Sequence, residues 1–331
     1  MISRNRVLFL IILFCAAIIA VAFLPFAGME RIVPSQLQGD SLQSNIFFSL
    51  RLPRVLTAFA AGGGLSLCGM VFQGIFRNPL ADPFTLGIAS GASCGAALMI
   101  LLGLGGTFLG VPVLAVGAFA GAVFSLFAVM GLSRALRSHS SHTVLLIGIA
   151  VSFFFSSVLM LSQYLSSMRD SFQIIRWLMG GVEVFGYGAL FSILPFLGFG
   201  MLLVGMNLSS LDHILTGEDI ASTRGVNVKA SRNTLLVAAS LLVGGIVSVC
   251  GPIGFVGLMV PHFCRILLGA SHTVLAPASF LAGGIFLAVC DTFARTVIAP
   301  AEMPVGVITA LLGGPFLLWV LFRSGGRGEL R

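Results

Sequence analysis

The 331 residues are 57% hydrophobic and only 9% charged, and their mean hydropathy is +1.08. This composition excludes an ordinary soluble domain, in which about a quarter of the residues are charged. Apolar runs of about 17 to 25 residues recur along the whole chain, which is the length that a helix needs to cross a hydrocarbon core of about 30 Å. The sequence therefore predicts an all-α polytopic membrane protein, with residues 1–331 in a single transmembrane domain.

The net charge of +7 does not indicate nucleic-acid binding, because the basic residues are dispersed and flank apolar segments, as the positive-inside rule describes. All six cysteines lie within or beside apolar segments and have no C-x-x-C spacing. We interpret them as small packing residues rather than as a disulfide framework or a metal site, and we expect no bound metal.

Ten apolar segments are predicted to span the membrane. In chain order they cover residues 7–27, 51–75, 86–104, 111–132, 144–164, 189–206, 234–249, 254–268, 276–294 and 305–322. We favour a retained first helix over a signal peptide, whose apolar region should be only about 7 to 15 residues long. Between the fifth and sixth segments, residues 166–187 mix charged, aromatic and apolar side chains, which predicts an interfacial helix.

Ten spans would put both termini on the same side of the membrane. Twelve of the 18 basic residues would then lie on the side of the termini and six on the other side. By the positive-inside rule this count predicts that both termini are cytoplasmic.

A sequence pattern that occurs twice in the chain predicts two related halves, residues 1–188 and 189–331. The pattern Gly62-Gly63-x-x-Ser66-x-Cys68-Gly69 recurs 182 residues later as Gly244-Gly245-x-x-Ser248-x-Cys250-Gly251. Five spans separate the two copies, so the second half would be inverted in the membrane, a 5+5 pseudo-repeat of the kind seen in many transporters. Chance matching remains the alternative in a chain this rich in Gly and Ser.

The polar segment 207–233 carries too many charged residues to lie within a membrane. Its charged and titratable residues are Asp212, His213, Glu218, Asp219, Arg224, Lys229 and Arg232. The patterns Ser209-x-x-Asp212 and Thr216-x-x-Asp219 fit capping boxes, and Gly217 and Gly225 would each end a short helix, with Arg224 close to the end of the second.

Two helices of about six to eight residues would be too short to be stable alone in water. Their apolar residues, Leu211, Ile214, Leu215 and Ile220, then need somewhere to pack. A docked partner protein is the preferred interpretation, and an amphipathic hairpin on the membrane surface is the alternative.

The chain lacks the residues that would let it drive transport by itself. Its single lysine, Lys229, does not stand in a G-x-x-x-x-G-K-[ST] phosphate loop, and no H-E-x-x-H or nucleophile elbow is present. The interiors of the spans are almost free of charge, whereas ion-coupled carriers usually place ionisable groups there. The chief exception is Asp291, which we expect to pair with Arg295 one helical turn on. An external energy source is indicated, and no enzymatic activity is expected.

Four motifs, which follow one another along the chain, resemble those of a known protein family. They are Arg51-Leu52-Pro53-Arg54; Asn78-Pro79-Leu80-Ala81-Asp82-Pro83 followed by Leu86-Gly87; Gly251-Pro252-Ile253-Gly254-Phe255-Val256-Gly257-Leu258 running into Pro261-His262-x-x-Arg265; and Glu302-Met303-Pro304-Val305-Gly306. The chain resembles, over nearly its whole length, the FecCD family, the permeases of ABC importers for iron-siderophores, haem and cobalamin.

The resemblance implies a multi-pass subunit of a prokaryotic cytoplasmic (inner) membrane, with ten spans. Its partners would be a second copy of itself, two ABC ATPases at the cytoplasmic face and an extracytoplasmic substrate-binding protein. Substrate would move between the two copies. ATP and Mg would be used by the ATPase, and this subunit would bind no cofactor of its own.

The resemblance also implies roles for particular residues. ATPase coupling maps to Leu211, Asp212, His213, Gly217, Glu218, Arg224, Gly225 and Val226. Docking of the binding protein maps to Arg51, Arg54 and Arg295, with snorkelling to lipid headgroups as the alternative. The cytoplasmic gate maps to Asn78, Leu80, Ser141 and His142, where His142 departs from the small hydroxylated residue expected.

Two questions stay open at this point. An ion-coupled secondary transporter that works without an ATPase is the alternative function. Siderophore, haem, cobalamin and oxyanion all remain candidate substrates.

Overall fold

The computed structural model describes residues 4–28, 30, 32–37, 41–84, 86–108, 111–136 and 141–325. Its regular structure in these ranges is helical apart from one short antiparallel hairpin, in which β1 (Thr107–Phe108) pairs with β2 (Val111–Pro112). All ten predicted apolar segments form helices: α1 (Arg4–Phe23), α3 (Leu52–Phe76), α4 (Ile88–Leu101), α5 (Val113–Ala135), α6 (Ser141–Leu165), α8 (Gly188–Met206), α11 (Val228–Cys250), α12 (Val256–Leu268), α13 (His272–Thr296) and α14 (Val305–Gly325).

Seven helical stretches in the described residues are long and apolar enough to cross a membrane, and α4, α12 and the described part of α14 are shorter apolar helices. Shorter elements join them: η1 (Leu24–Phe26), η2 (Pro34–Leu37), α2 (Leu42–Ile46), η3 (Phe47–Arg51), α7 (Met168–Leu178), α9 (Leu208–Thr216) and α10 (Glu218–Thr223). Helix α7 is the predicted helix between the fifth and sixth segments. Thus the predicted all-α membrane architecture is confirmed.

Helix α11 begins at Val228, about two turns before the predicted start at residue 234. The side chain of Asn227 accepts a hydrogen bond from the Ala230 amide at 3.0 Å and so caps the helix. This cap allows the polar residues 228–233 to be helical although they lie outside the apolar run.

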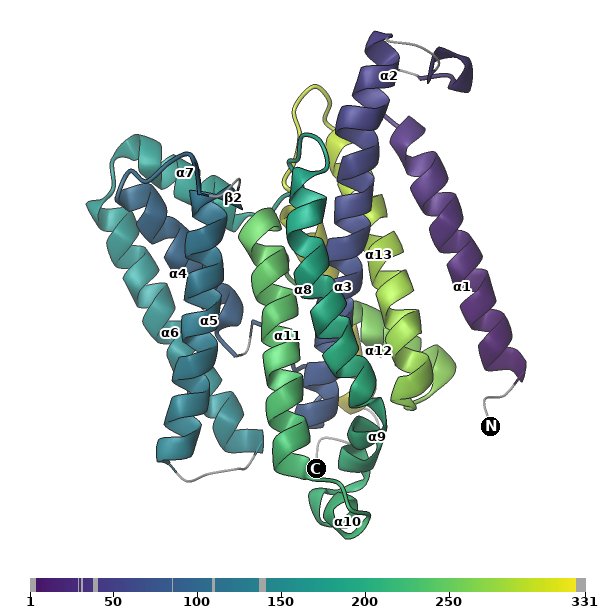
Figure 1. Ribbon diagram of the computed structural model, residues 1–331, viewed down its shortest axis with the longest axis vertical. Helices are drawn as coiled ribbons and strands as arrows, with labels where there is room; N and C mark the ends of the chain where they lie inside the picture. The colour runs from purple at the N-terminus through teal and green to yellow at the C-terminus, as the bar shows by residue number, and fades with distance from the viewer. Residues whose placement is uncertain are drawn as a thin grey trace.

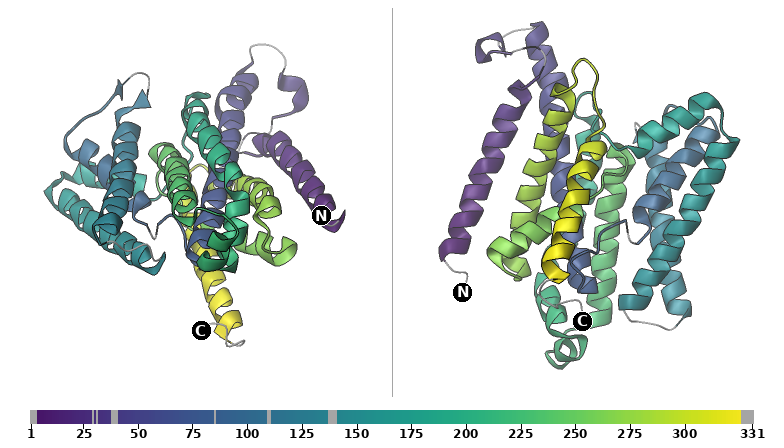
Figure 2. Two further views of the ribbon diagram at one scale, coloured as in Figure 1. Left: turned by 60° about the horizontal axis from the view of Figure 1, so that its bottom comes forward. Right: turned by 180° about the vertical axis from the view of Figure 1, so that it is seen from behind.

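The long helices run between two ends of the molecule, which we call the α10 end and the α7 end. Helices α9 and α10 lie at one end, and α2 and α7 lie at the other (Figure 1). Helix α1 begins and α14 ends at the α10 end (Figure 2). The polar segment and the two ends of the described chain therefore share one side.

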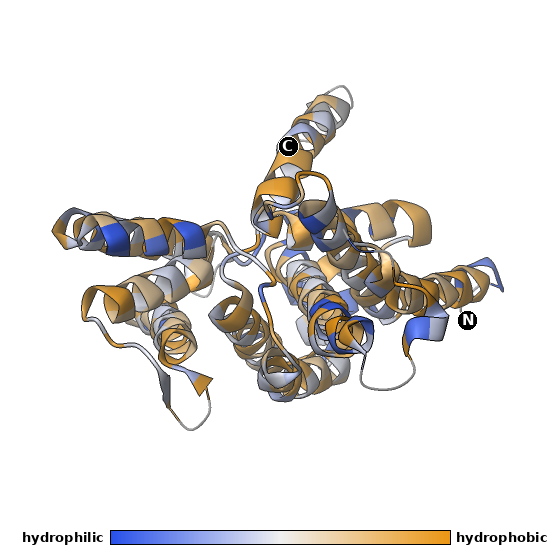
Figure 3. Cartoon of the chain, turned by 90° about the horizontal axis from the view of Figure 1, so that it is seen from above, coloured by the Kyte–Doolittle hydropathy of each residue, from blue (hydrophilic) through white to orange (hydrophobic). Residues whose placement is uncertain are grey.

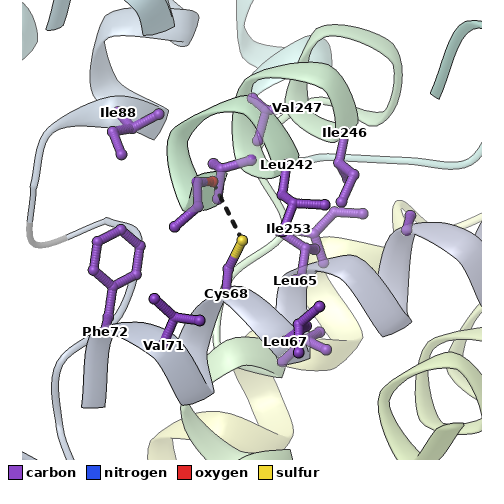
Figure 4. Packing of buried hydrophobic residues seen from close by; sticks show 14 of the residues in the cluster. Leu65, Leu67, Cys68, Val71, Phe72, Ile88, Leu242, Ile246, Val247 and Ile253 are labelled. Atoms are coloured by element: carbon purple, nitrogen blue, oxygen red, sulfur yellow. Dashed lines mark hydrogen bonds between the residues drawn. The ribbon is translucent and has the colours of Figure 1, made fainter. Parts of the chain in front are cut away.

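Helix α3 is the centre of the structure, and almost its whole length is buried. It packs against α13 and α12 at glycines, because a Cβ on Gly62 would overlap the Gly283 carbonyl and one on Gly69 would overlap the Gly257 carbonyl. Small residues at such positions let membrane helices approach closely. Against α11, the Cys68 thiol donates a hydrogen bond to the Ala239 carbonyl oxygen at 3.3 Å (Figure 4).

Helices α4, α5, α6 and α7 form a second group beside this centre (Figures 1 and 2). Backbone contacts again join α4 to α5, where Gly91 faces Gly121 and Gly95 faces Gly117. Seen from the α7 end, most of the ribbon is orange or pale (Figure 3). Because many large apolar side chains are exposed on the outside of α4, α5, α6 and α7, the surface of this group suits lipid rather than water.

Candidate functional site

The polar segment forms the two short helices that the sequence predicts, α9 and α10. The predicted helix-ending glycines are also confirmed, because Gly217 has φ 134° and Gly225 has φ 81°, a region that favours glycine. The predicted capping boxes are wrong. Helix α9 follows α8 after the single residue Asn207, so Ser209 lies inside the helix, and the Thr216 hydroxyl donates back to the His213 carbonyl oxygen at 2.7 Å.

Leu211 and Ile214 are both fully buried within the chain. Helix α9 packs against α3 and α13, and Leu211 lies beside Gly74 of α3. The expectation that these side chains need a partner protein is therefore wrong, because the membrane helices themselves cover them. Leu215 is half-buried, and Ile220 remains 47% exposed.

Asp212 ties α9 to the start of α13. Its Oδ1 accepts hydrogen bonds from the His272 amide at 2.8 Å and contacts His272 Nδ1 at 2.7 Å, and the Ser271 hydroxyl donates to Oδ2 at 3.5 Å. The carboxylate thus caps the N-terminus of α13 from another segment, where the helix dipole favours negative charge. Because His272 is completely buried, this contact is part of the packed interior.

Glu218 ties the first turn of α10 to two further helices. Its Oε1 pairs with Arg232 of α11 and lies 3.5 Å from Arg77 at the end of α3. Arg232 is buried, whereas Arg77 is exposed. Together, Asp212 and Glu218 join the polar segment to the ends of three membrane helices.

The opposite side of α10 faces solvent. Asp219, Ile220, Arg224 and Gly225 are exposed, and Val226 is half-buried. Arg224 Nη1 lies 3.4 Å from His213 Nδ1, which links the end of α10 to α9. The segment consequently has an anchored side toward the helices and a free side with mixed charge.

At the α7 end, Arg51 and Arg295 are both only 8% exposed. Arg51 donates to the carbonyl oxygens of Phe26 at 3.3 Å and Glu30 at 2.8 Å, and Arg295 donates to the Leu24 carbonyl oxygen at 2.9 Å. Each guanidinium therefore holds the segment that follows α1 against α3 or α13.

Arg54 makes the central ion pair of this end. Its Nε lies 3.0 Å from Asp291 Oδ2 and its Nη2 lies 3.1 Å from Oδ1, while Nη1 lies 2.7 Å from Glu302 Oε2. The predicted pair between Asp291 and Arg295 is wrong. Asp291 points to α3, whereas the Arg295 guanidinium donates hydrogen bonds to the Leu24 carbonyl oxygen and the Thr292 hydroxyl.

The expected gate residues fall in two places. Asn78 Oδ1 accepts a hydrogen bond from the Leu80 amide at 2.9 Å in the turn after α3, and Leu80 packs against an apolar cluster that includes Leu258 and Phe316. Helix α6 begins at Ser141, but the side chains of Ser141 and His142 lie outside the described part of the structure.

Met179, at the end of α7, lines two cavities. One of about 700 Å³ lies at the α7 end and carries both Arg54–Glu302 and Arg176–Glu183 ion pairs on its walls. The other, of about 560 Å³, is lined by Asp82, Phe84, Ala89, Ser90, Ser93, Ser156, Leu159, Leu178, Met179, Pro252, Gly254, Phe255, Gly306, Val307 and Ala310. Both are large enough for a sizeable ligand. Among the described residues, no group of three His, Cys, Asp or Glu side chains could hold a metal ion.

Three partners of the site residues were missed from the sequence. Glu302 stands in the quoted Glu-Met-Pro-Val-Gly motif, which was a usable signal. His272 and Arg77 had no local signal, because their acidic partners Asp212 and Glu218 lie far away along the chain.

The model of the FecCD transport family matches residues 7–323. An uncharacterised ABC transporter permease protein, YvrB of Bacillus subtilis, is 40% identical over 87% of this chain and 82% of its own length. The hemin transport system permease protein HmuU of Yersinia pestis is 38% identical over 85% of this chain and 84% of its own. The vitamin B12 import system permease protein BtuC of Serratia proteamaculans is 35% identical over 95% of this chain and 92% of its own.

A solved structure is similar to this fold. It is described as an inward-facing conformation of a transporter assigned to the metal-chelate ABC type. The TM-score is 0.84 at 31% sequence identity, and the match covers 95% of this chain and 99% of the other.

Proposed function

Since this chain belongs to the FecCD transport family and is the non-catalytic, multi-pass permease subunit of an ABC importer, we propose that it moves a metal chelate of the iron-siderophore, haem or cobalamin class across the cytoplasmic membrane of a prokaryote. The names of the hemin and vitamin B12 relatives and of the similar structure support this substrate class. The observation that carries the mechanism is the anchoring of the polar segment by Asp212 and Glu218.

The proposed assembly contains two copies of the chain, two ABC ATPases and one binding protein. The ATPases dock at the α10 end, which is then the cytoplasmic side and carries both termini, and they hydrolyse ATP with Mg. The binding protein delivers substrate at the α7 end. Ten spans follow if α4, α12 and α14 cross the membrane together with the seven longer helical stretches.

The two halves, about 1–188 and 189–331, are proposed to be an inverted pseudo-repeat. The antiparallel courses of α3 and α11, which carry the matched glycine patterns, support this arrangement (Figure 1).

In the proposed mechanism, the ATPases push on the exposed side of α10 and α9, with Leu211, Asp212, His213, Gly217, Glu218, Arg224, Gly225 and Val226 as the coupling residues. Asp212 passes the motion to α13, and Glu218 passes it to α11 and α3. Helices α3 and α13 would move as one body, because they pack backbone to backbone at Gly62 and are joined at the α7 end by Arg54 and Asp291. A displacement driven by ATP at the α10 end would therefore reach the α7 end.

The proposed path begins at the 700 Å³ cavity and continues along the 560 Å³ cavity, with a facing second copy as its other wall. The serines, phenylalanines and Met179 of this lining suit a bulky chelate of mixed polarity. Asn78, Leu80, Ser141 and His142 are proposed to close the path at the cytoplasmic side.

Docking of the binding protein is proposed at Arg51, Arg54 and Arg295. Arg51 and Arg295 already bind backbone carbonyls, so their contribution would be to hold the docking surface in shape. Arg54 can take a direct part, because its Nη1 partner Glu302 is 46% exposed, and a carboxylate of the binding protein could replace it.

The coupling proposal is tested by reversing the charges of Asp212, Glu218 and Arg224 in the reconstituted importer. We expect loss of both chelate uptake and substrate-stimulated ATP hydrolysis, with circular dichroism unchanged. If transport and ATP turnover both survive, the coupling role is wrong.

A second experiment separates the importer from the ion-coupled alternative. The permease alone is reconstituted in liposomes under a proton or sodium gradient, without ATPase, and uptake of labelled cobalamin, haem and ferric siderophore is measured. We expect no uptake. Gradient-driven uptake under these conditions would overturn the ATP-driven proposal.

A further inference from the structure

A small basic cavity lies at the α10 end, between the last turns of α5 and the first turns of α11. Its volume is about 50 Å³, and its walls are formed by Val129, Met130, Ser133, Arg134, Val144, Lys229, Arg232, Asn233 and Leu236. The four α11 residues are spaced so that they share one face of that helix. Two helix ends and the start of α6 therefore converge on one site.

Positive charge is concentrated around this cavity. Arg232 is buried, and the carboxylate that pairs with it, Glu218, is shared with Arg77. Lys229 stands in the first turn of α11, where the helix dipole favours an anion, and that turn contains no acidic residue. Arg134 adds a third positive charge to the lining. Three basic side chains and no acidic side chain therefore line the cavity.

The size and the lining of the cavity restrict what it can hold. A cavity needs about 10–15 Å³ to hold one water molecule, so this cavity has room for roughly four groups of that size, which is about the size of a phosphate. A nucleotide or a metal chelate would not fit. Four of the remaining lining residues, Val129, Met130, Val144 and Leu236, are apolar and suit the carbon atoms that follow a phosphate group in a lipid, whereas Ser133 and Asn233 are polar.

We propose that this cavity binds the phosphate of an anionic phospholipid, with Arg134, Lys229 and Arg232 as the phosphate-binding side chains. Because α5 and α11 are long and apolar enough to cross a membrane, the site at their ends would lie among lipid headgroups, which favours a lipid over a soluble phosphate as the source. Basic pockets between membrane helices are recognised by anionic headgroups in this way.

The position of Arg232 gives the site a regulatory consequence. The same guanidinium pairs with Glu218, the residue that anchors α10. A bound phosphate would share Arg232 with Glu218 and so alter how firmly α10 is held. This consequence rests on the proposed coupling role, whereas the binding site itself does not.

The test uses the full-length permease without ATPase, so that its failure is distinguishable from failure of the importer assignment. Native mass spectrometry measures the affinity for phosphatidylglycerol and for phosphatidylcholine, supplied at equal amounts. Lys229→Gln and Arg134→Gln are compared with Arg224→Gln, a matched control that removes an exposed charge at the same end but outside the cavity. A parallel arm supplies glycerol 3-phosphate as a soluble phosphate.

We expect phosphatidylglycerol to bind in preference to phosphatidylcholine. Each cavity variant should weaken it about fivefold, as expected for one basic residue near anionic lipid, and the control should leave it unchanged. Equal binding of the two lipids, or equal phosphatidylglycerol affinity in all three variants, would overturn the proposal. If glycerol 3-phosphate binds as tightly as the lipid, the phosphate chemistry is supported and the lipid source is overturned.

Discussion

Removal of the Arg54 guanidinium should show how much its ion pair with Asp291, at the α7 end, stabilises the chain. The Asp291 side chain is fully buried, and three nitrogen–oxygen distances of 3.0 to 3.2 Å join it to Arg54. Arg54→Met would leave that carboxylate buried without its partner. Breaking a buried pair on one side costs about 3–5 kcal/mol, and we expect the free energy of unfolding to fall by this amount.

The second ion pair of Arg54 provides an internal control. Glu302 is 46% exposed, so its contribution is screened by water. We expect Glu302→Gln to cost no more than about 1 kcal/mol. The contrast between the two substitutions separates the buried contact from the surface contact of the same guanidinium.

The measurement is a double-mutant cycle of Arg54→Met and Asp291→Leu. Unfolding by SDS in mixed micelles is followed by the fluorescence of Trp177 and Trp319. Because the double variant removes both charges together, it should be more stable than the sum of the single effects by up to about 3 kcal/mol. Additivity within about 0.5 kcal/mol would refute the reasoning. A stronger coupling of Asp291 to Arg295 would instead restore the pairing expected from the sequence.

Three further outcomes are expected. Asp212→Ala removes the cap of α13, and should lower the free energy of unfolding by about 1–2 kcal/mol in the SDS titration. The same variant should reduce substrate-stimulated ATP hydrolysis in the reconstituted importer. Unchanged stability would argue against the cap. Glu218→Gln keeps the shape of the side chain but not its charge, and should reduce ATPase docking measured by co-purification, with full docking as the contrary result. Gly69→Ala should lower the midpoint of thermal unfolding, because a Cβ there overlaps the Gly257 carbonyl and overpacking costs about 1–3 kcal/mol. Gly131→Ala is the control, because a Cβ at Gly131 meets open space and should leave the midpoint unchanged. Equal midpoints for the two variants would contradict the close approach of the helices.

Most of the helical architecture was predictable because the signals are local. A helix satisfies its own backbone hydrogen bonds in lipid, so a long apolar run is sufficient to indicate one. The start of α11 was predicted late because Asn227 extends the helix into polar sequence. The glycines that end α9 and α10 were also local signals, since Gly217 and Gly225 need backbone angles that other residues rarely adopt.

The contacts of the candidate site were harder to predict. Asp291 has Arg295 one turn away, yet it pairs with Arg54, which is 237 residues distant in the sequence. Leu211 and Ile214 looked like residues in need of a partner, yet other helices of the same chain cover them. In each case several local choices were available, and packing selected among them.

The sequence by itself determined that this protein is a bundle of apolar helices interrupted by one charged segment, and that it carries no phosphate loop of its own. These properties follow from composition and short-range pattern. Only the tertiary structure decided that Asp212 and Glu218 anchor the charged segment to three helices, and that Lys229, Arg134 and Arg232 meet around one cavity. The physical reason is that a charged group takes the partner that the packing of the helices brings within reach, whatever its distance along the chain.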